Sequence, residues 1–361
     1  MSVSDSTSSY KAVIYADPPS TKTEVVDLDI PEPDVGQVLV RLHYSGVCHT
    51  DYSFCTNGFV GAPPTMKGQI GGHEGIGEVV KLGPGVVLPA VGTRVGIKYA
   101  ADACLNCEPC LLGGETSCTQ VKISGFYTPG TFQQYCLTSA KYATVIPDGL
   151  PSDAAAPLMC AGITVYSALT RGGVKPGDWV LVTGAGGGLG HLGVQYARAL
   201  GARVLAVDHG SKEDLCRSLG ADEFVDFSQF PANEPPGESQ MAARIRELTA
   251  GGVKIALMCS SNSGTYEQAV YWLRFRGTIV CVGVPDNAAV MAGSPMMFLE
   301  KELRMIGVKT ANRQEAVETL ALAAKGAIKT HFEVRPMGEL TQIFEEMEKG
   351  MLRGRVVLDL R

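Results

Sequence analysis

Hydrophobic and polar positions alternate in two different ways along this chain. Between Pro176 and Gly307, short apolar runs are separated by segments whose apolar residues recur at helical spacing. The runs that predict strands lie at 179–183, 203–207, 223–227, 254–259 and 278–283, and the helical patterns lie at 189–200, 241–249 and 265–275. This alternation is typical of a parallel sheet with crossover helices, and it predicts a doubly wound α/β domain.

The remaining sequence predicts a second, β-rich domain. Before residue 165, short alternating runs such as 38–42 and 77–82 are broken by glycine and proline, which favours antiparallel or barrel-like strands. After residue 307, helical stretches at 313–325 and 340–348 precede a strand at 355–360. The length of 361 residues is enough for two hydrophobic cores.

Composition and charge narrow the function classes. Hydrophobic residues make up 45% and charged residues 19%, which excludes a disordered chain. The net charge of −6 disfavours nucleic acid as a partner. The polar start MSVSDSTSSY is neither a secretory signal nor a transit peptide, and no apolar stretch reaches the roughly 18 residues of a membrane span. We therefore expect a cytoplasmic protein without a membrane partner, in which the 11 cysteines bind metal or are buried rather than form disulfides.

Four of these cysteines form a compact pattern. Cys104, Cys107, Cys110 and Cys118 have the spacing C-x2-C-x2-C-x7-C, and four thiolates so close together can surround one tetrahedral zinc ion. An iron–sulfur cluster is the competing interpretation, but the bacterial ferredoxin spacing has three residues before its last cysteine. Unligated thiols are the third. Because four protein ligands leave no open position, the predicted zinc is structural.

A glycine-rich turn follows the predicted strand 179–183. The turn comprises Gly184, Ala185, Gly186, Gly187, Gly188, Leu189 and Gly190. It contains G-x-G, although the third glycine of a strict G-x-G-x-x-G would fall on Leu189. Such a turn between a strand and a helix binds a phosphate with its backbone N–H groups, whereas a tight packing turn is the alternative. Asp208, at the end of the next strand, would bind the adenosine ribose and repel a 2′-phosphate, so the pattern favours NAD.

Two further polar segments lie in glycine-rich, apolar surroundings. They are Cys48-His49-Thr50-Asp51 and Gly71-Gly72-His73-Glu74. Cysteine and histidine are zinc ligands, and three protein ligands with one open position define a catalytic zinc site. Spacing alone does not identify the third ligand, and each residue taken singly is more often structural than ligating.

The combination of GVCHTD, GGHEG, the four-cysteine lobe, PLMCAGITVY and the glycine turn with Asp208 resembles the zinc-dependent medium-chain alcohol dehydrogenases. The likeness is closest to the fungal tetrameric, yeast-like type and runs from about Lys11 to the C-terminus. It implies a GroES-like catalytic domain at 1–165, with a structural zinc lobe at about 99–120. A Rossmann domain at 166–307 would interrupt it, and residues 308–361 would complete it.

The same resemblance implies a catalytic zinc held by Cys48, His73 and Cys160. Glu74 matches the family's conditional zinc ligand. Asp51 matches the carboxylate that orients the ligand histidine. With the four-cysteine site, this gives two zinc ions per chain.

Roles in binding cofactor and substrate are also implied by the resemblance. Thr50 would bond the alcohol, and His49 and Arg355 would lie near the NAD pyrophosphate. Lys212 could reach the adenosine ribose, and Val284 would lie near cofactor and substrate. The residues expected to line the substrate pocket are Thr50, Phe59, Tyr99 and Val284.

The implied activity is reversible hydride transfer between NAD(H) and a primary alcohol or aldehyde, in a homotetramer. Ser53 stands where many relatives carry the histidine that ends the proton relay. Phe59, Tyr99 and Val284 replace bulkier residues of the yeast-type pocket, so we expect a substrate larger than ethanol, with aromatic alcohols and biosynthetic intermediates as candidates. A broad-range ethanol-type enzyme is the alternative. Less favoured are a superfamily reductase acting on quinone or enoyl groups and a non-enzymatic zinc-stabilised module.

Overall fold

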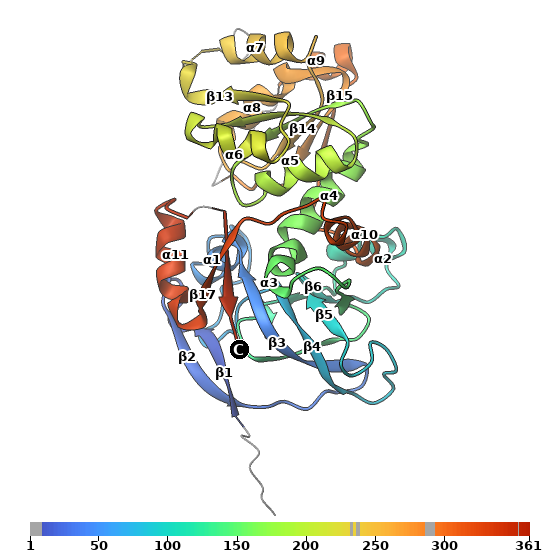
Figure 1. The fold of residues 1–361 in the computed structure, drawn as a ribbon, viewed down its shortest axis with the longest axis vertical. Helices are drawn as coiled ribbons and strands as arrows, with labels where there is room; N and C mark the ends of the chain where they lie inside the picture. Colours follow the sequence, from blue (N-terminus) through green and yellow to red (C-terminus); the bar gives the residue numbers. More distant parts are fainter. Residues whose placement is uncertain (1–8, 232–233, 236–238, 286–292, 353) are drawn as a thin grey trace, which may run out of the picture. The chain divides into compact units, whose positions relative to one another are not determined.

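The computed structural model describes residues 9–231, 234–235, 239–285, 293–352 and 354–361, which form two compact units (Figure 1). The first unit contains the described residues up to Cys160, with Asn312–Ala324 and Thr330–Arg361. The second contains Ala161–Ala311 and Lys325–Lys329. We expected boundaries after residues 165 and 307. The observed division assigns the whole helix that begins at Ala161 to the second unit, together with the described residues up to Ala311 and the separate segment Lys325–Lys329.

The first unit is built mainly of strands. Its strands are β1 Ser9–Tyr15, β2 Thr23–Asp29, β3 Gln37–Val47, β4 Gly75–Leu82, β5 Arg94–Ile97, β6 Ala100–Asp102, β7 Lys122–Ser124, β8 Tyr127–Thr128, β9 Tyr135–Ser139, β10 Thr144–Val145, β17 Phe332–Pro336 and β18 Arg355–Asp359. Its helices are α1 His49–Cys55, α2 Glu108–Leu111, α3 Ser152–Ala155, α10 Arg313–Ala324 and α11 Leu340–Glu348.

The main sheet of this unit joins distant parts of the chain. Its strand order is β10-β5-β4-β3-β18-β17, with β9 also paired to β3. Alternate side chains of β3, including Val38, Val40 and Leu42, are buried in the core. The C-terminal strand β18 runs antiparallel to β3, with Val356 opposite Val47. This pairing brings the start of β18 beside the point where β3 ends and α1 begins.

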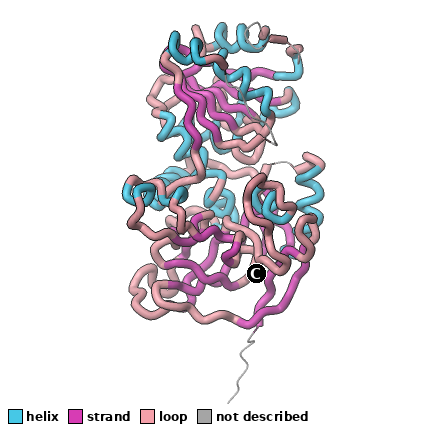
Figure 2. Tube along the Cα trace, turned by 180° about the vertical axis from the view of Figure 1, so that it is seen from behind, coloured by secondary structure: helices cyan, strands magenta, loops and turns pink. Residues whose placement is uncertain are grey.

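The second unit confirms the predicted doubly wound sheet. Its strands are β11 Trp179–Thr183, β12 Arg203–Asp208, β13 Glu223–Asp226, β14 Val253–Met258, β15 Leu273–Cys281 and β16 Arg304–Gly307. Its helices are α4 Ala161–Gly172, α5 Gly190–Ala199, α6 Glu213–Ser218, α7 Gln240–Leu248, α8 Ser263–Trp272 and α9 Pro295–Lys301. Figure 2 shows the strands side by side with helices along the sheet.

All strands of this sheet are parallel, in the order β13-β12-β11-β14-β15-β16. The order reverses between β11 and β14, and in such sheets ligands bind outside the carboxyl ends of the strands at this switch point. The glycine turn leaves the carboxyl end of β11. The sequence therefore places the predicted nucleotide-binding turn where this Rossmann topology requires it.

One predicted boundary in this unit is wrong. The helical pattern at 265–275 predicts a helix that continues through Phe275, whereas α8 ends at Trp272 and β15 begins at Leu273. The backbone is already extended at Leu273, with φ −80° and ψ 140°, and Arg276 has a positive φ of 55°, so a right-handed helix does not continue through Phe275. Among the described residues, none of the helices has both the length and the apolar character that crossing a bilayer requires.

Candidate functional site

The first unit gathers four potential metal ligands from three separate segments. Cys48 precedes α1, His73 and Glu74 precede β4, and Cys160 follows a short helical turn at Ala156–Met159. One ligand atom from each of these four side chains lies within 4.8 Å of all the others. The structure thus brings together the residues that the resemblance implied for a catalytic zinc.

The geometry of this cluster fits a zinc ion. Two thiolate sulfurs, each about 2.3 Å from a tetrahedral zinc, lie roughly 3.8 Å apart, and the Cys48 and Cys160 sulfurs are 3.9 Å apart. His73 Nε2 and Glu74 Oε2 are buried and have no hydrogen-bond partner among the described residues. A buried polar atom without a partner is costly, and a cation bound by these atoms would remove that cost.

Asp51 orients the ligand residues on both sides of it. Its Oδ1 lies 2.8 Å from His73 Nδ1, and its Oδ2 accepts a hydrogen bond of 2.9 Å from the backbone N–H of Cys48. Burial opposes charge on the imidazole, but Asp51 and Cys48 together outweigh it and raise the pKa of His73. With Nδ1 facing the carboxylate, Nε2 is left to face the cluster, as in other carboxylate–histidine–metal arrangements.

Arg355 takes part in this cluster, which the sequence reasoning missed. Its side chain is 7% exposed, and its guanidinium donates a hydrogen bond from Nη2 to Glu74 Oε1. Burial raises the pKa of Glu74 to about 7, against the lowering effect of Arg355. The expected contact of Arg355 with a pyrophosphate stays a prediction. Its pairing with Glu74 follows from the placement of β18 beside β3. No local pattern in the sequence predicts that these two strands pair.

The contact between Cys48 and Cys160 favours the thiolate form of Cys48. The hydrogen bond from the Cys160 thiol lowers the pKa of Cys48, and the contacts with His73 and Arg355 lower it further, against the opposing effect of burial. The same bond raises the pKa of Cys160. Because a thiolate is the form that binds metal, Cys48 is prepared to act as a ligand.

The predicted proton-relay residues lie on α1. Thr50 is half-buried in its first turn, and His49 is exposed. His49 Nδ1 lies 3.4 Å from Ser53 Oγ, one helical turn further along. The serine that replaces the family's histidine therefore lies next to another polar, exposed side chain.

The residues expected to line the substrate pocket are in two units. Tyr99 places its ring edge-on to His73, with 5.9 Å between ring centroids. Phe59 packs edge-on against Phe54 at 5.2 Å and lines a small hollow together with Ser53. Val284 follows β15 in the second unit and is 66% exposed. The structure thus places Tyr99 directly beside the predicted metal site.

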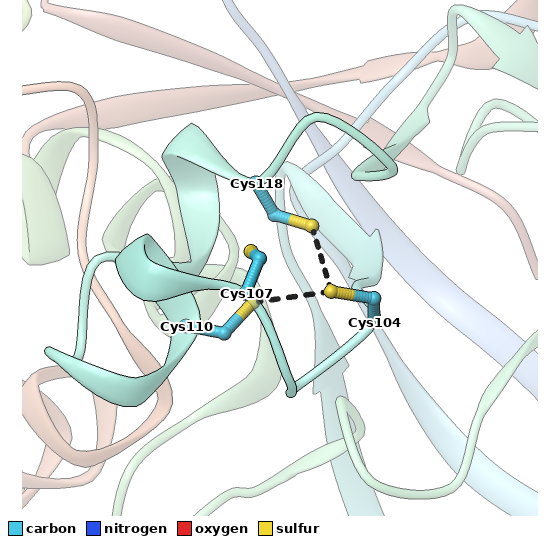
Figure 3. Close-up of side chains that lie close together, drawn as sticks. All are labelled: Cys104, Cys107, Cys110 and Cys118. Carbon is cyan, nitrogen blue, oxygen red and sulfur yellow. Dashed lines mark hydrogen bonds between the residues drawn. The ribbon is translucent and has the colours of Figure 1, made fainter.

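The four-cysteine lobe forms a second cluster (Figure 3). The Cys104 sulfur lies 3.5 Å from that of Cys118 and 4.0 Å from that of Cys110, and all four sulfurs, including that of Cys107, lie within 4.8 Å of one another. These separations bracket the roughly 3.8 Å expected around a tetrahedral zinc. The lobe therefore fits the structural zinc ion that its spacing predicts.

The glycine turn in the second unit contacts the residues predicted with it. A side chain on Gly190 would lie 2.0 Å from the Gly184 carbonyl oxygen, so only glycine allows α5 to begin so close to β11. Asp208 Oδ2 accepts a hydrogen bond of 2.8 Å from the Gly186 N–H. The side chain of Lys212 packs over Gly186. The acidic side chain that is predicted to bind the adenosine ribose thus lies at the turn, next to the backbone N–H groups predicted to bind phosphate.

Comparisons with known proteins agree with this geometry. Residues 34–148 match the family described as alcohol dehydrogenase GroES-like domain, and residues 188–325 match that described as zinc-binding dehydrogenase. Alcohol dehydrogenase 2 of Emericella nidulans is 48% identical over 97% of each chain. An alcohol dehydrogenase of Schizosaccharomyces pombe is 39% identical, over 96% of this chain and 95% of its own.

A solved structure shows the same fold over the whole chain. Acetophenone reductase from Geotrichum candidum, in complex with NAD, is 26% identical, covers 98% of both chains and matches with a TM-score of 0.83. The predicted fold class, a GroES-like domain with a Rossmann domain, is confirmed by these matches and by the strand order of the second unit. The chain belongs to the zinc-dependent medium-chain alcohol dehydrogenase family.

Proposed function

We propose that this protein is an NAD(H)-linked zinc alcohol dehydrogenase that interconverts a primary alcohol bulkier than ethanol and its aldehyde. Family membership makes it an oxidoreductase with zinc and NAD(H) as cofactors. The observation that carries the proposal is the buried cluster of Cys48, His73, Glu74 and Cys160, whose unpartnered His73 Nε2 points to a metal ion. A superfamily reductase that works without zinc would have no use for these four donors.

The chain's own residues divide the work at this site. Cys48, His73 and Cys160 would hold the catalytic zinc, with Glu74 as a conditional ligand. Zinc bound there supplies Lewis-acid polarisation of an alcohol or carbonyl oxygen. Asp51 keeps the His73 ring turned toward the cluster.

Thr50 is proposed to hold the substrate hydroxyl and take part in moving its proton. His49 and Ser53, 3.4 Å apart on α1, then offer a route for the proton to solvent. This route replaces the histidine-ended relay of many relatives. A positioned acid–base group contributes about 10²- to 10⁴-fold to rate, which is only part of an enzyme's rate enhancement. We therefore expect the enzyme to be active with Ser53 in place of the relatives' histidine.

The glycine turn and Asp208 are proposed to bind the cofactor. Backbone N–H groups of the turn would bind the pyrophosphate, and the Asp208 carboxylate would bind the ribose hydroxyls and exclude a 2′-phosphate. NAD supplies the hydride acceptor when the alcohol is oxidised. Lys212, which already packs over Gly186, could then contact the ribose.

A substrate larger than ethanol is the finer part of the proposal. Phe59, Tyr99 and Val284 stand where the yeast-type pocket is narrower, and a solved relative is named for its action on acetophenone, an aromatic ketone. A broad-range ethanol-type dehydrogenase remains the second candidate, and the curated relatives named only as alcohol dehydrogenases favour it.

A panel of alcohols tests the substrate proposal. The zinc-loaded protein is mixed with NAD and with ethanol, 1-butanol, benzyl alcohol or cinnamyl alcohol, and NADH absorbance is followed. We expect kcat/KM for the aromatic alcohols to exceed that for ethanol by about tenfold or more, because each buried methylene contributes about 0.8 kcal/mol. Faster turnover of ethanol would favour the broad-range enzyme, and NADH formation with none of the alcohols would contradict the dehydrogenase assignment.

The quaternary state and location are further proposals drawn from the family resemblance. We propose a homotetramer in the cytoplasm. Sedimentation velocity of the zinc-loaded protein checks the first, and a monomer or dimer at micromolar concentration would contradict it.

A further inference from the structure

Tyr15, the last residue of β1, lies next to the metal cluster but belongs to none of the motifs identified in the sequence. Its side chain is 0% exposed, and its hydroxyl donates a hydrogen bond of 3.1 Å to the backbone carbonyl of Asp51 on α1. Its ring also packs near Phe344 of α11, with 6.3 Å between ring centroids. The phenol therefore reaches from the sheet edge into the helix that carries Asp51.

The backbone of the same residue holds the other ligand segment. The Tyr15 N–H donates to the Gln69 carbonyl at 2.8 Å, and the Tyr15 carbonyl accepts from the Gly68 N–H at 2.9 Å. A side chain added to Gly71 would lie 2.0 Å from the Tyr15 hydroxyl oxygen. The chain that leads into His73 is thus fitted closely around Tyr15, by two main-chain bonds and by direct contact at Gly71.

Asp51 connects these contacts to the ligands. Its carboxylate binds His73 Nδ1 on one side and the Cys48 N–H on the other, while its carbonyl accepts the Tyr15 hydrogen bond. A displacement of this residue would therefore move the imidazole and the thiol together. Partners of this kind, one shell outside the ligands, commonly change metal affinity 10- to 100-fold when they are lost.

We infer that Tyr15 is a positioning residue for the catalytic metal: it joins the α1 segment carrying Cys48 and Asp51 to the segment carrying His73, and so maintains the spacing of the ligands. The inference rests on the proposed zinc-dependent function. The contacts of Tyr15 described above reach Asp51, Gly68, Gln69 and Gly71, which are not among the proposed ligands. Its contribution should consequently be seen in metal affinity and metal geometry.

Tyr15→Phe removes one hydroxyl and keeps the packed ring. A buried hydrogen bond has a modest net effect, so we expect the catalytic zinc to bind about two- to tenfold more weakly, as measured by competition with a chromogenic chelator. The zinc of the Cys104–Cys118 lobe should keep its affinity and serves as an internal reference. When cobalt replaces the catalytic zinc, the visible absorption bands of the variant should shift from those of the wild type.

Tyr10→Phe is the matched control. Tyr10 lies on the same strand, is also buried, and its hydroxyl donates a hydrogen bond of 2.6 Å to Gln133 Oε1, which belongs to neither of the two segments that Tyr15 joins. Tyr10→Phe should lower the free energy of unfolding about as much as Tyr15→Phe does, without a change in zinc affinity. Gly71→Ala places a methyl group against the Tyr15 hydroxyl and should lower the affinity for the same catalytic zinc. It provides a second variant in case Tyr15→Phe folds poorly.

Equal catalytic-zinc affinity and unchanged cobalt bands in Tyr15→Phe and the wild type would overturn the inference. Parallel weakening of both zinc ions would overturn it as well, since that result would mean general destabilisation. The number of zinc ions bound by the wild-type chain distinguishes failure of this inference from failure of the proposed function. Two zinc ions per wild-type chain uphold the proposed site, whereas one zinc ion, held only by the lobe, would reject the site and the Tyr15 role together.

Discussion

At the scale of single residues, Lys98 shows how much a buried charge depends on its surroundings. Its side chain is 1% exposed and donates hydrogen bonds to the Tyr142 carbonyl at 2.8 Å and to Thr144 Oγ1 at 3.0 Å. Burial, opposed by Glu115 and assisted by Arg313, lowers the pKa of Lys98 to about 7. The folded protein therefore disfavours the charged amine near neutral pH.

This shift predicts a pH dependence of stability. Between about pH 7 and the ordinary lysine pKa of 10.5, the unfolded chain holds a proton on Lys98 that the folded chain does not. The Lys98 contribution to the free energy of unfolding should rise with pH in this window, by at most about 1.4 kcal/mol per pH unit. Below pH 7 both states are protonated and the folded state bears the whole burial cost.

Lys98→Met should therefore flatten the pH dependence. Urea unfolding at pH 7, 8 and 9 measures the stability of wild type and variant, and their difference should change in favour of the wild type as the pH rises. Lys11→Met, at an amine that is 56% exposed, is the control and should leave the slope unchanged. A constant difference between Lys98→Met and wild type across this range would contradict the assignment.

At the scale of elements, the cysteine lobe is attached to α10 by polar contacts. Glu115, in the lobe, is 5% exposed at its side chain, and its Oε1 accepts bonds of 3.0 Å from both the N–H and Nε of Arg313. Asn312 Nδ2 donates to the Gly113 carbonyl at 3.0 Å. The helix start is thus held by the loop between two of the four cysteines.

Glu115→Gln should loosen this attachment. Charge-assisted bonds contribute about 1.5–3 kcal/mol, but Arg313 is 41% exposed and solvent screens the pair, so we expect a loss of about 1 kcal/mol in the free energy of unfolding. Hydrogen exchange should become faster in the first turn of α10 and in the lobe. Glu108→Gln, an exposed charge change in the same lobe, should do neither, and equal effects of the two variants would refute the anchoring role.

Element positions show how far local patterns extend. The strand at 179–183 and the helix at 340–348 have the predicted bounds because apolar spacing and turn residues agree there. The predicted end of the helix at 265–275 was wrong because Phe275 continues the helical spacing, whereas the backbone becomes extended at Leu273. Tertiary pairing of β15 with β14 overrides the local pattern at that point.

At the scale of the whole molecule, chemistry is divided between the two units. Both proposed zinc clusters lie in the first unit, and the glycine turn with Asp208 lies in the second. The metal ions should therefore stabilise one unit selectively. By mass action, zinc at 1,000 times its dissociation constant stabilises the folded state by about 4 kcal/mol for each site.

Zinc removal tests this division. Dialysis against a strong chelator should accelerate hydrogen exchange in the lobe and around α1 and the loop before β4, while the strands β11–β16 keep their protection. Adding zinc back should reverse the change, because metal binding to these sites is coupled to folding. Uniform acceleration in both units would contradict it.

The sequence by itself determined the features whose partners lie close together in the chain. The four-cysteine spacing, the strand–turn–helix around Gly184–Gly190 and the alternating strands and helices are all short-range patterns, since thiols and turns a few residues apart are constrained by local geometry. Cys48, His73 and Cys160 were united in advance only through the family resemblance. Their spacing does not connect them.

Only the tertiary structure decided the contacts between distant segments. The pairing of β18 with β3 brought Arg355 to Glu74, and the close packing at Gly71 brought Tyr15 to Asp51. The physical reason is that such contacts depend on how strands align and how side chains fill the space between them. That arrangement is a property of the packed core as a whole, which no single stretch of residues encodes.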